Sequence, residues 1–170
     1  MGIVKNNKGF TLIEGLIAIF FLLMVTAGIF GVLKQATSST QASKDKLVAA
    51  YLAQEGIEIV RNLRDSNWVK YRGDLTKWLS GLPEGAYEAQ YDSLTLSAYS
   101  GSGRYLASTT AGFYLYDTLG QSTKFKRKIE ISYDRPANPI VVTVTVTVSW
   151  SARGKDSEIK AVETLYNWFE

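Results

Sequence analysis

The chain contains neither cysteine nor histidine, and only three prolines in 170 residues. Without cysteine there is no disulfide scaffold and no thiolate metal site. Without histidine the chain lacks the commonest general base and the imidazole ligands of metal centres. Walker, calcium-loop and nucleophile-elbow motifs are missing as well. We therefore expect a protein that is not an enzyme, with no catalytic residue, no metal and no cofactor.

The net charge of the chain beyond its N-terminus is also small. The chain has 19 Lys and Arg against 16 Asp and Glu, and two of the lysines, Lys5 and Lys8, lie in the first nine residues, so 17 basic side chains remain beyond them. A balance so close to neutral gives no electrostatic argument for nucleic-acid binding by the chain as a whole.

A long apolar run follows this short basic N-terminus. Residues 15–33 carry no charge, and as a helix they would extend over roughly 28 Å, enough to span a hydrocarbon core. The run is longer than the apolar region of a secretory signal and lacks its small-residue cleavage site. With Lys8 before it and Lys34 after it, the pattern predicts a membrane-spanning helix over residues 10–33 with a cytoplasmic N-terminus.

Glu14 is the one ionisable side chain between residues 9 and 33. A carboxylate within an apolar segment costs about 2.5 to 3.5 kcal/mol and usually has a partner. One interpretation leaves Glu14 hydrated near the membrane interface. The other supplies a partner, because a cut after Gly9 would give Phe10 a free α-ammonium group that pairs with Glu14 of a neighbouring chain.

Residues 8–14 read KGFTLIE, and this stretch resembles the prepilin-type leader of type IV pilins and type II secretion pseudopilins. The resemblance implies that a prepilin peptidase cuts after Gly9 and methylates Phe10, and that Glu14 serves subunit assembly. It implies a single-pass protein of the cytoplasmic (inner) membrane that later enters an extracytoplasmic pilus or pseudopilus. The implied partners are other pilin subunits, the peptidase and an inner-membrane assembly platform with a separate ATPase.

Two further stretches, AQEGIEIVRNLRD and a late strand ending in VSW, resemble a minor-pilin subgroup. Many pilin heads carry a cysteine pair that this chain lacks, which also favours a minor pilin. Many major pilins have a proline in the apolar helix, whereas this chain has Gly28 and Gly31 there. These glycines either allow the helix to stretch or melt locally or permit close packing between helices, and both interpretations stay open.

The helix is expected to continue over residues 34–65 as an amphipathic segment, with a bend or fraying near residues 37–43. Its apolar face, which also contains Glu55, would pack on a sheet and comprises Leu47, Val48, Tyr51, Leu52, Ile59 and Leu63. Residues 66–170 would form a globular, β-rich head after a cleaved leader (1–9) and the two helical segments. This organisation predicts an α+β, pilin-like fold.

In the head, residues 66–88 mix turn formers with the aromatic residues Trp68, Tyr71 and Trp78. We expect this segment to cover an edge of the sheet, although such aromatic side chains could also bind a neighbouring subunit or a ligand. Period-two patterns predict strands at residues 87–91, 94–99, 113–117, 124–133, 140–151 and 158–169, with the last three forming an antiparallel meander.

One positive patch, KFKRK, places Lys124, Lys126 and Lys128 about 6.5 to 7 Å apart on one strand face. DNA contact is one interpretation, since pilins of transformation machines handle DNA. The favoured interpretation is an exposed strand face, or an edge strand that lysines protect from pairing. A filament-tip adhesin or DNA receptor is thus the alternative function, and a lone membrane-anchored surface protein is a third.

Overall fold

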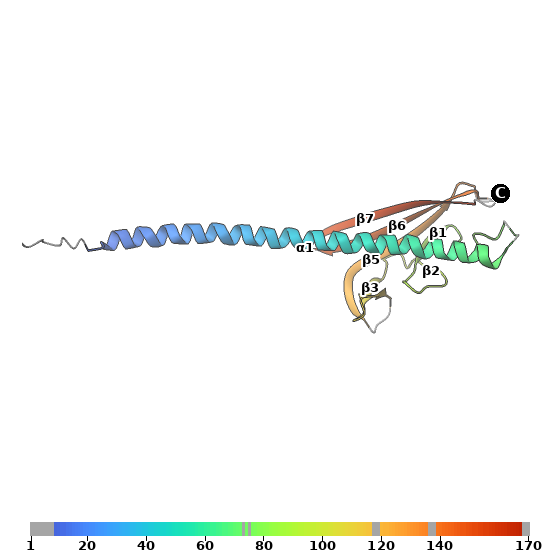
Figure 1. Ribbon diagram of the computed structural model, residues 1–170, viewed down its shortest axis with the longest axis horizontal. Coiled ribbons are helices and arrows are strands. Elements are labelled where there is room, and N and C mark those ends of the chain that lie inside the picture. Colours follow the sequence, from blue (N-terminus) through green and yellow to red (C-terminus); the bar gives the residue numbers. More distant parts are fainter. Residues whose placement is uncertain (1–8, 73, 75, 117–119, 136–138, 168–170) are drawn as a thin grey trace, which may run out of the picture. The chain divides into compact units, whose positions relative to one another are not determined.

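The structure, a computed structural model, describes residues 9–72, 74, 76–116, 120–135 and 139–167. Within these described residues, one long helix, α1, is followed by seven strands (Figure 1). The strands are β1 (Gly85–Glu88), β2 (Ser97–Ala98), β3 (Tyr105–Ser108), β4 (Tyr114–Leu115), β5 (Gln121–Tyr133), β6 (Val141–Ala152) and β7 (Lys155–Tyr166). The chain forms two compact units, Met1–Lys44 and Asp45–Glu170, and all seven strands belong to the second. The α+β class with a long apolar N-terminal helix is as predicted.

Helix α1 runs from Leu12 to Lys70, with no interruption at the polar stretch where we expected a bend or fraying. The hydroxyl groups of this stretch bond back to the helix itself. Thr37 Oγ1 donates to the carbonyl of Leu33 at 2.9 Å, and Thr40 Oγ1 donates to that of Ala36 at 3.0 Å. Hydroxyls bonded in this way leave the helix N–H groups to their usual carbonyl partners, which is compatible with a continuous helix.

The predicted helix end, at residue 65, is wrong by five residues. The last turn of α1 is tied to the segment that follows it, because the Asn67 side-chain amide donates to the carbonyls of Trp78 at 3.1 Å and Ser80 at 2.7 Å. The Trp68 ring stacks on the Trp78 ring at a centroid distance of 6.4 Å. These tertiary contacts extend the helix to Lys70 beyond the point where its apolar pattern fades.

Strand β5 is central to the sheet. It pairs antiparallel with β6 along one side, and with β1 and β3 in succession along the other. Strands β5, β6 and β7 form the predicted meander, with Ile129 opposite Val146 and Val146 opposite Ala161. The β6–β7 turn is two residues long, and Arg153 and Gly154 both have positive φ, at 55° and 73°. That geometry matches the right-handed twist of the strands that it joins.

Several strand predictions need correction. Strand β1 covers residues 85–88 instead of 87–91, and β2 covers only two residues of the predicted 94–99. Strand β3 was not predicted, because its four residues, YLAS, are too short to show a clear alternation, and it pairs with β5 through an irregular register. Strand β7 begins at Lys155, three residues before the predicted start at residue 158, because Arg153 and Gly154 alone complete the reversal.

The core lies between the sheet and the part of α1 that belongs to the second unit (Figure 1). Alternate residues of β6 are buried on this side, as predicted: Val142, Val144, Val146, Val148 and Trp150. Helix α1 contributes Leu52, Ile57 and Val60. Leu47 and Tyr51, however, do not pack on the sheet as we expected: they are 56% and 63% exposed, because the stripe that faces the sheet is narrower than the apolar stripe of the sequence.

One buried side chain in this core is charged. Arg127 of β5 is fully buried, and its guanidinium group donates to the carbonyls of Leu52 at 3.0 Å and Ala89 at 2.5 Å. Its Nη1 also lies 3.5 Å from Glu55 Oε1. Glu55, which interrupted the apolar face in the sequence, thus lies there to face a cation that comes from the sheet.

Candidate functional site

Within the first unit, residues 12–33 present an apolar helical surface on all sides. Every large apolar side chain from Leu12 to Leu33 is at least half exposed, from 50% at Ile17 to 84% at Leu12. Soluble monomers rarely expose contiguous apolar patches above a few hundred Å². Among the described residues, α1 is the one helix long and apolar enough to cross a membrane. A membrane-spanning capacity is therefore present in the segment where the sequence predicted it.

The proposed cleavage point lies just before this helix. Gly9 and Phe10 are described, exposed and outside regular secondary structure, and the helix begins two residues after Phe10, at Leu12. Residues 1–8 of the expected leader lie outside the described residues. A peptidase needs an exposed stretch of backbone that is free of helical hydrogen bonds, and the bond between Gly9 and Phe10 meets that need.

Thr11 is a residue that the sequence analysis missed. It directly precedes the helix, and its carbonyl accepts the N–H groups of Glu14 at 3.1 Å and Gly15 at 3.2 Å. The hydroxyl of Thr11 lies 3.4 Å from Glu14 Oε2. This is the position of a helix N-cap, and the signal in the sequence was Thr-x-x-Glu, the pattern of a capping box.

Glu14 therefore lies in the first turn of α1, with its side chain exposed. A carboxylate in that turn interacts favourably with the helix dipole, by about 0.3 to 1 kcal/mol at an exposed site. The cap gives Glu14 a role within its own chain, separate from the assembly role that the resemblance implies. Its pairing with a neighbouring Phe10 ammonium stays a prediction.

Gly28 and Gly31 both lie inside α1, and the helix passes through them without a break. A Cβ atom built at either position meets nothing within 4 Å in this single chain. Both predictions for these glycines, local stretching and close helix packing, concern states with neighbouring chains, so both stay predictions.

The three lysines of KFKRK each have a partner within the chain. Lys124 Nζ lies 2.5 Å from the buried carboxylate of Asp45, and Lys126 Nζ donates to the carbonyl of Ser102 at 2.9 Å. Lys128 Nζ lies 3.0 Å from Glu130 on the same strand. Each ammonium group is therefore bound to a different partner within the chain.

The position of β5 also corrects one interpretation of these lysines. Because β5 is paired on both sides, they do not protect an edge strand. The outer face that β5 shares with β7 carries acidic side chains too, with Glu130 beside Lys128 and Glu158 3.1 Å from Lys160. Mixed charges weaken the attraction of this face for a phosphate backbone, so DNA contact has no support from the arrangement.

The geometry therefore singles out the N-terminal segment: an exposed Gly9–Phe10 bond, a capped helix start at Thr11 and Glu14, and an apolar helix that its own chain leaves uncovered. Comparison of the chain with protein-family models, with curated proteins and with solved structures finds no match.

Proposed function

We propose that this chain is the precursor of a structural subunit of a type IV pilus-like filament, a minor pilin or a pseudopilin. The observation that carries the proposal is the juxtaposition at the start of α1. An exposed, non-helical Gly9–Phe10 bond stands immediately before a helix that combines Glu14 with large apolar side chains that are at least half exposed.

The chemistry of the cut explains why Glu14 tolerates an apolar neighbourhood. Hydrolysis after Gly9 creates an α-ammonium group on Phe10, next to the Thr11 cap. This ammonium group lies at the positive end of the helix dipole, where a cation is unfavourable. A carboxylate from a neighbouring subunit neutralises it, and the same contact neutralises Glu14. Each charge offsets the cost of burying the other. The helices can therefore pack closely only where an ammonium group and a carboxylate from two subunits meet.

The apolar part of α1 then has two environments in turn. The membrane covers it before assembly, with the N-terminus at the cytoplasmic face where the prepilin peptidase acts. Neighbouring helices cover it in the filament. Extraction from the membrane needs an energy source, which we assign to the ATPase of the assembly platform, since the sequence contains no nucleotide-binding motif.

The first test is the intact mass of the protein from the membrane or sheared-filament fraction. We expect a chain that begins at Phe10 and carries one added methyl group. An uncut chain in cells with an active prepilin peptidase, or a chain trimmed elsewhere, would leave only a membrane-anchored surface protein.

A second test separates assembly from helix capping. Glu14→Gln keeps the shape of the side chain and removes its charge, and we expect it to abolish incorporation into filaments while cleavage continues. Thr11→Ala is the matched control, because it removes the hydroxyl that lies 3.4 Å from Glu14 Oε2 and keeps the carboxylate; incorporation should persist. Equal loss in both variants would show that the cap, and not a charge between subunits, is what assembly requires.

A further inference from the structure

Strand β7 is a long open edge of the sheet. Among the described residues its one strand partner is β6, whereas the edges formed by β2 and β4 are two residues long each. The twelve residues of β7 pair with β6 from Lys155 to Tyr166 without a register shift. The strand therefore has neither a bulge nor a proline, two features that prevent edge-to-edge pairing. Its outer row of N–H and C=O groups is available to another strand.

Charged side chains protect this edge against most partners. Alternate residues of a strand lie on opposite faces of the sheet. Glu158 and Lys160 lie on the outer face, whereas Lys155, Ile159 and Glu163 lie on the face toward α1. An apolar strand that paired here would leave these charges without partners, so the pattern selects against unspecific pairing. A strand that fits must carry the opposite charge at each of these positions.

The charges of β7 are complementary to those of a second β7. In an antiparallel pair with Ile159 opposite itself, Glu158 of each copy lies opposite Lys160 of the other. Lys155 lies opposite Glu163 in the same way, so two-fold symmetry yields four pairs of opposite charge. Directly opposite residues share a face of the sheet, and their Cβ atoms are about 4.5 to 5.5 Å apart, close enough for the side chains to interact.

The neighbouring registers are less favourable. Moving the two-fold axis by one residue, to Glu158 or to Lys160, keeps the faces of the two sheets matched. Each of these registers, however, places a side chain opposite its own copy, which brings two like charges together. Like charges directly opposite each other destabilise a strand pair. The register about Ile159 is therefore the one that the charges select.

Contacts within the chain leave these groups able to take part. Lys160 Nζ lies 3.1 Å from Glu158 Oε1, and both side chains are more than half exposed. An exposed pair of this kind contributes little by itself, whereas a network in which the signs alternate contributes more. Glu163 is held by Arg61 of α1, whose Nε donates to Glu163 Oε1 at 3.1 Å. Its carboxylate is thus fixed in place before Lys155 of a second copy approaches.

We propose that β7 pairs antiparallel with β7 of a second copy of this chain, with Ile159 on the two-fold axis, so that two sheets join into one. Antiparallel pairing reverses the strand direction from one copy to the other, whereas the subunits of one filament all point the same way. The paired copies therefore belong to two filaments that lie side by side. The pairing rests on the second unit alone, and only its assignment to neighbouring filaments rests on the proposed function. Repetition along two filaments multiplies the strength of a weak single contact.

The test uses the full chain in detergent micelles and takes advantage of its lack of cysteine. In the proposed pair, Ile159→Cys faces itself at a Cα separation of about 4.5 to 5.5 Å, within the range of a disulfide. Mild oxidation should link this variant into dimers. Ser157→Cys and Ala161→Cys face each other, so neither should dimerise alone. A mixture of these two variants should form a mixed disulfide.

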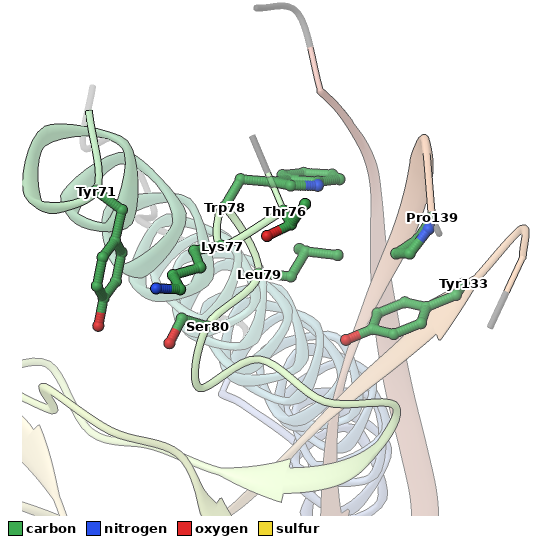
Figure 2. A pocket seen from close by; sticks show the side chains of 8 residues that line it. All are labelled: Tyr71, Thr76, Lys77, Trp78, Leu79, Ser80, Tyr133 and Pro139. Atoms are coloured by element: carbon green, nitrogen blue, oxygen red, sulfur yellow. The ribbon is translucent and has the colours of Figure 1, made fainter. Parts of the chain in front are cut away.

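Charge variants test what selects the register. Added to Ile159→Cys, Lys160→Glu brings like charges together twice and should lower the yield of dimer roughly tenfold. Adding Glu158→Lys as well exchanges the two signs and should restore the yield. Lys77→Glu is the matched control, because Lys77 is also exposed and lies 3.2 Å from a carboxylate, that of Asp74, but belongs to the segment after α1 (Figure 2). It should leave the yield unchanged, and the unfolding midpoint of each variant shows that it is folded.

The proposal is overturned if Ile159→Cys does not dimerise or if the three cysteine positions link equally. It is also overturned if Lys160→Glu behaves like Lys77→Glu, or if exchanging the two signs does not restore the dimer. The unprocessed chain in detergent is sufficient for this test. Its failure would therefore leave the intact-mass and Glu14 tests unaffected, and failure of those tests would remove only the assignment to neighbouring filaments.

Discussion

Replacing Gly56 with alanine tests how closely α1 lies on the sheet. A Cβ atom built at Gly56 would lie 2.7 Å from Val146 Cγ1, 3.2 Å from Val146 Cγ2 and 3.2 Å from Arg127 Cδ. Carbon atoms in ordinary contact are about 3.5 to 4.0 Å apart. Val146 is fully buried, so its methyl groups have no open space into which to turn. The helix must therefore rise from the sheet, or the core around Val146 must shift.

The magnitude follows from two opposed terms. Alanine stabilises a helix interior by about 1 kcal/mol relative to glycine. Overpacking of a close-packed core costs about 1 to 3 kcal/mol, because moving one contact by a few tenths of an ångström weakens all the contacts around it. The second term outweighs the first, since the new atom meets side chains on both β5 and β6. We expect Gly56→Ala to lower the free energy of unfolding by about 1 to 2 kcal/mol.

The assay is urea unfolding of the full chain in detergent, followed by tryptophan fluorescence. Gly28→Ala is the matched control, because Gly28 also lies in α1 and a Cβ atom there meets nothing within 4 Å; the midpoint of the head should not fall. Val146→Ala removes both methyl groups that would collide, so the double variant should be more stable than the sum of the single changes predicts. A Gly56→Ala protein as stable as the unmodified chain, with additive double-variant energies, would refute the close approach.

Three further predictions concern polar groups of the head. Burial raises the pKa of Tyr116 to about 12, whereas an unfolded tyrosine titrates near 10. As the pH rises, the unfolded state therefore loses its proton first. The free energy of unfolding is unaffected below about pH 10 and falls by up to roughly 3 kcal/mol by pH 12. Urea midpoints at pH 9 and 11 should therefore differ less in Tyr116→Phe than in the unmodified chain. Lys124→Gln removes the ammonium group that faces the buried Asp45, and should lower the free energy of unfolding by about 2 kcal/mol at pH 7. Adding Asp45→Asn should recover a large part of that loss in a double-mutant cycle. Arg127→Met should lower the free energy of unfolding by about 3 kcal/mol. Arg127→Met combined with Glu55→Leu should lower it less, because an apolar pair leaves no charge facing the core. Equal free energies of unfolding for the two proteins would contradict this.

The parts of the fold that the sequence predicted are those whose pattern repeats over many residues. The alternation of valine and threonine in β6 predicted which side faces the core, and the meander around it was confirmed. The uninterrupted apolar run predicted the first half of α1 for a similar reason. In both cases the exposure of each side chain follows its position within a single helix or strand. The periodicity of the local sequence is therefore enough to predict it.

Features that depend on tertiary contacts were not predictable in this way. The sequence does not show that α1 turns Leu47 and Tyr51 to solvent, because their exposure depends on which helix stripe the sheet covers. It does not show that Glu55 meets Arg127, which is 72 positions further along the chain. The cap at Thr11 differs, since its Thr-x-x-Glu signal is local and was present in the sequence.

The two units of this chain have opposite requirements, and this difference constrains any account of its function. The second unit encloses its own core, including a fully buried arginine that donates to two backbone carbonyls. The first unit leaves every large apolar side chain of residues 12–33 exposed, and water would make that arrangement costly. In the proposed function, lipid covers this surface first and neighbouring helices cover it afterwards. Exchange of one cover for the other is energetically feasible only if the single carboxylate in the segment is satisfied in both. The Thr11 cap and the helix dipole stabilise Glu14 in the first state, and the α-ammonium group of a processed neighbour would do so in the second. On this reasoning Glu14→Gln should leave membrane insertion intact and prevent only the transfer into a filament.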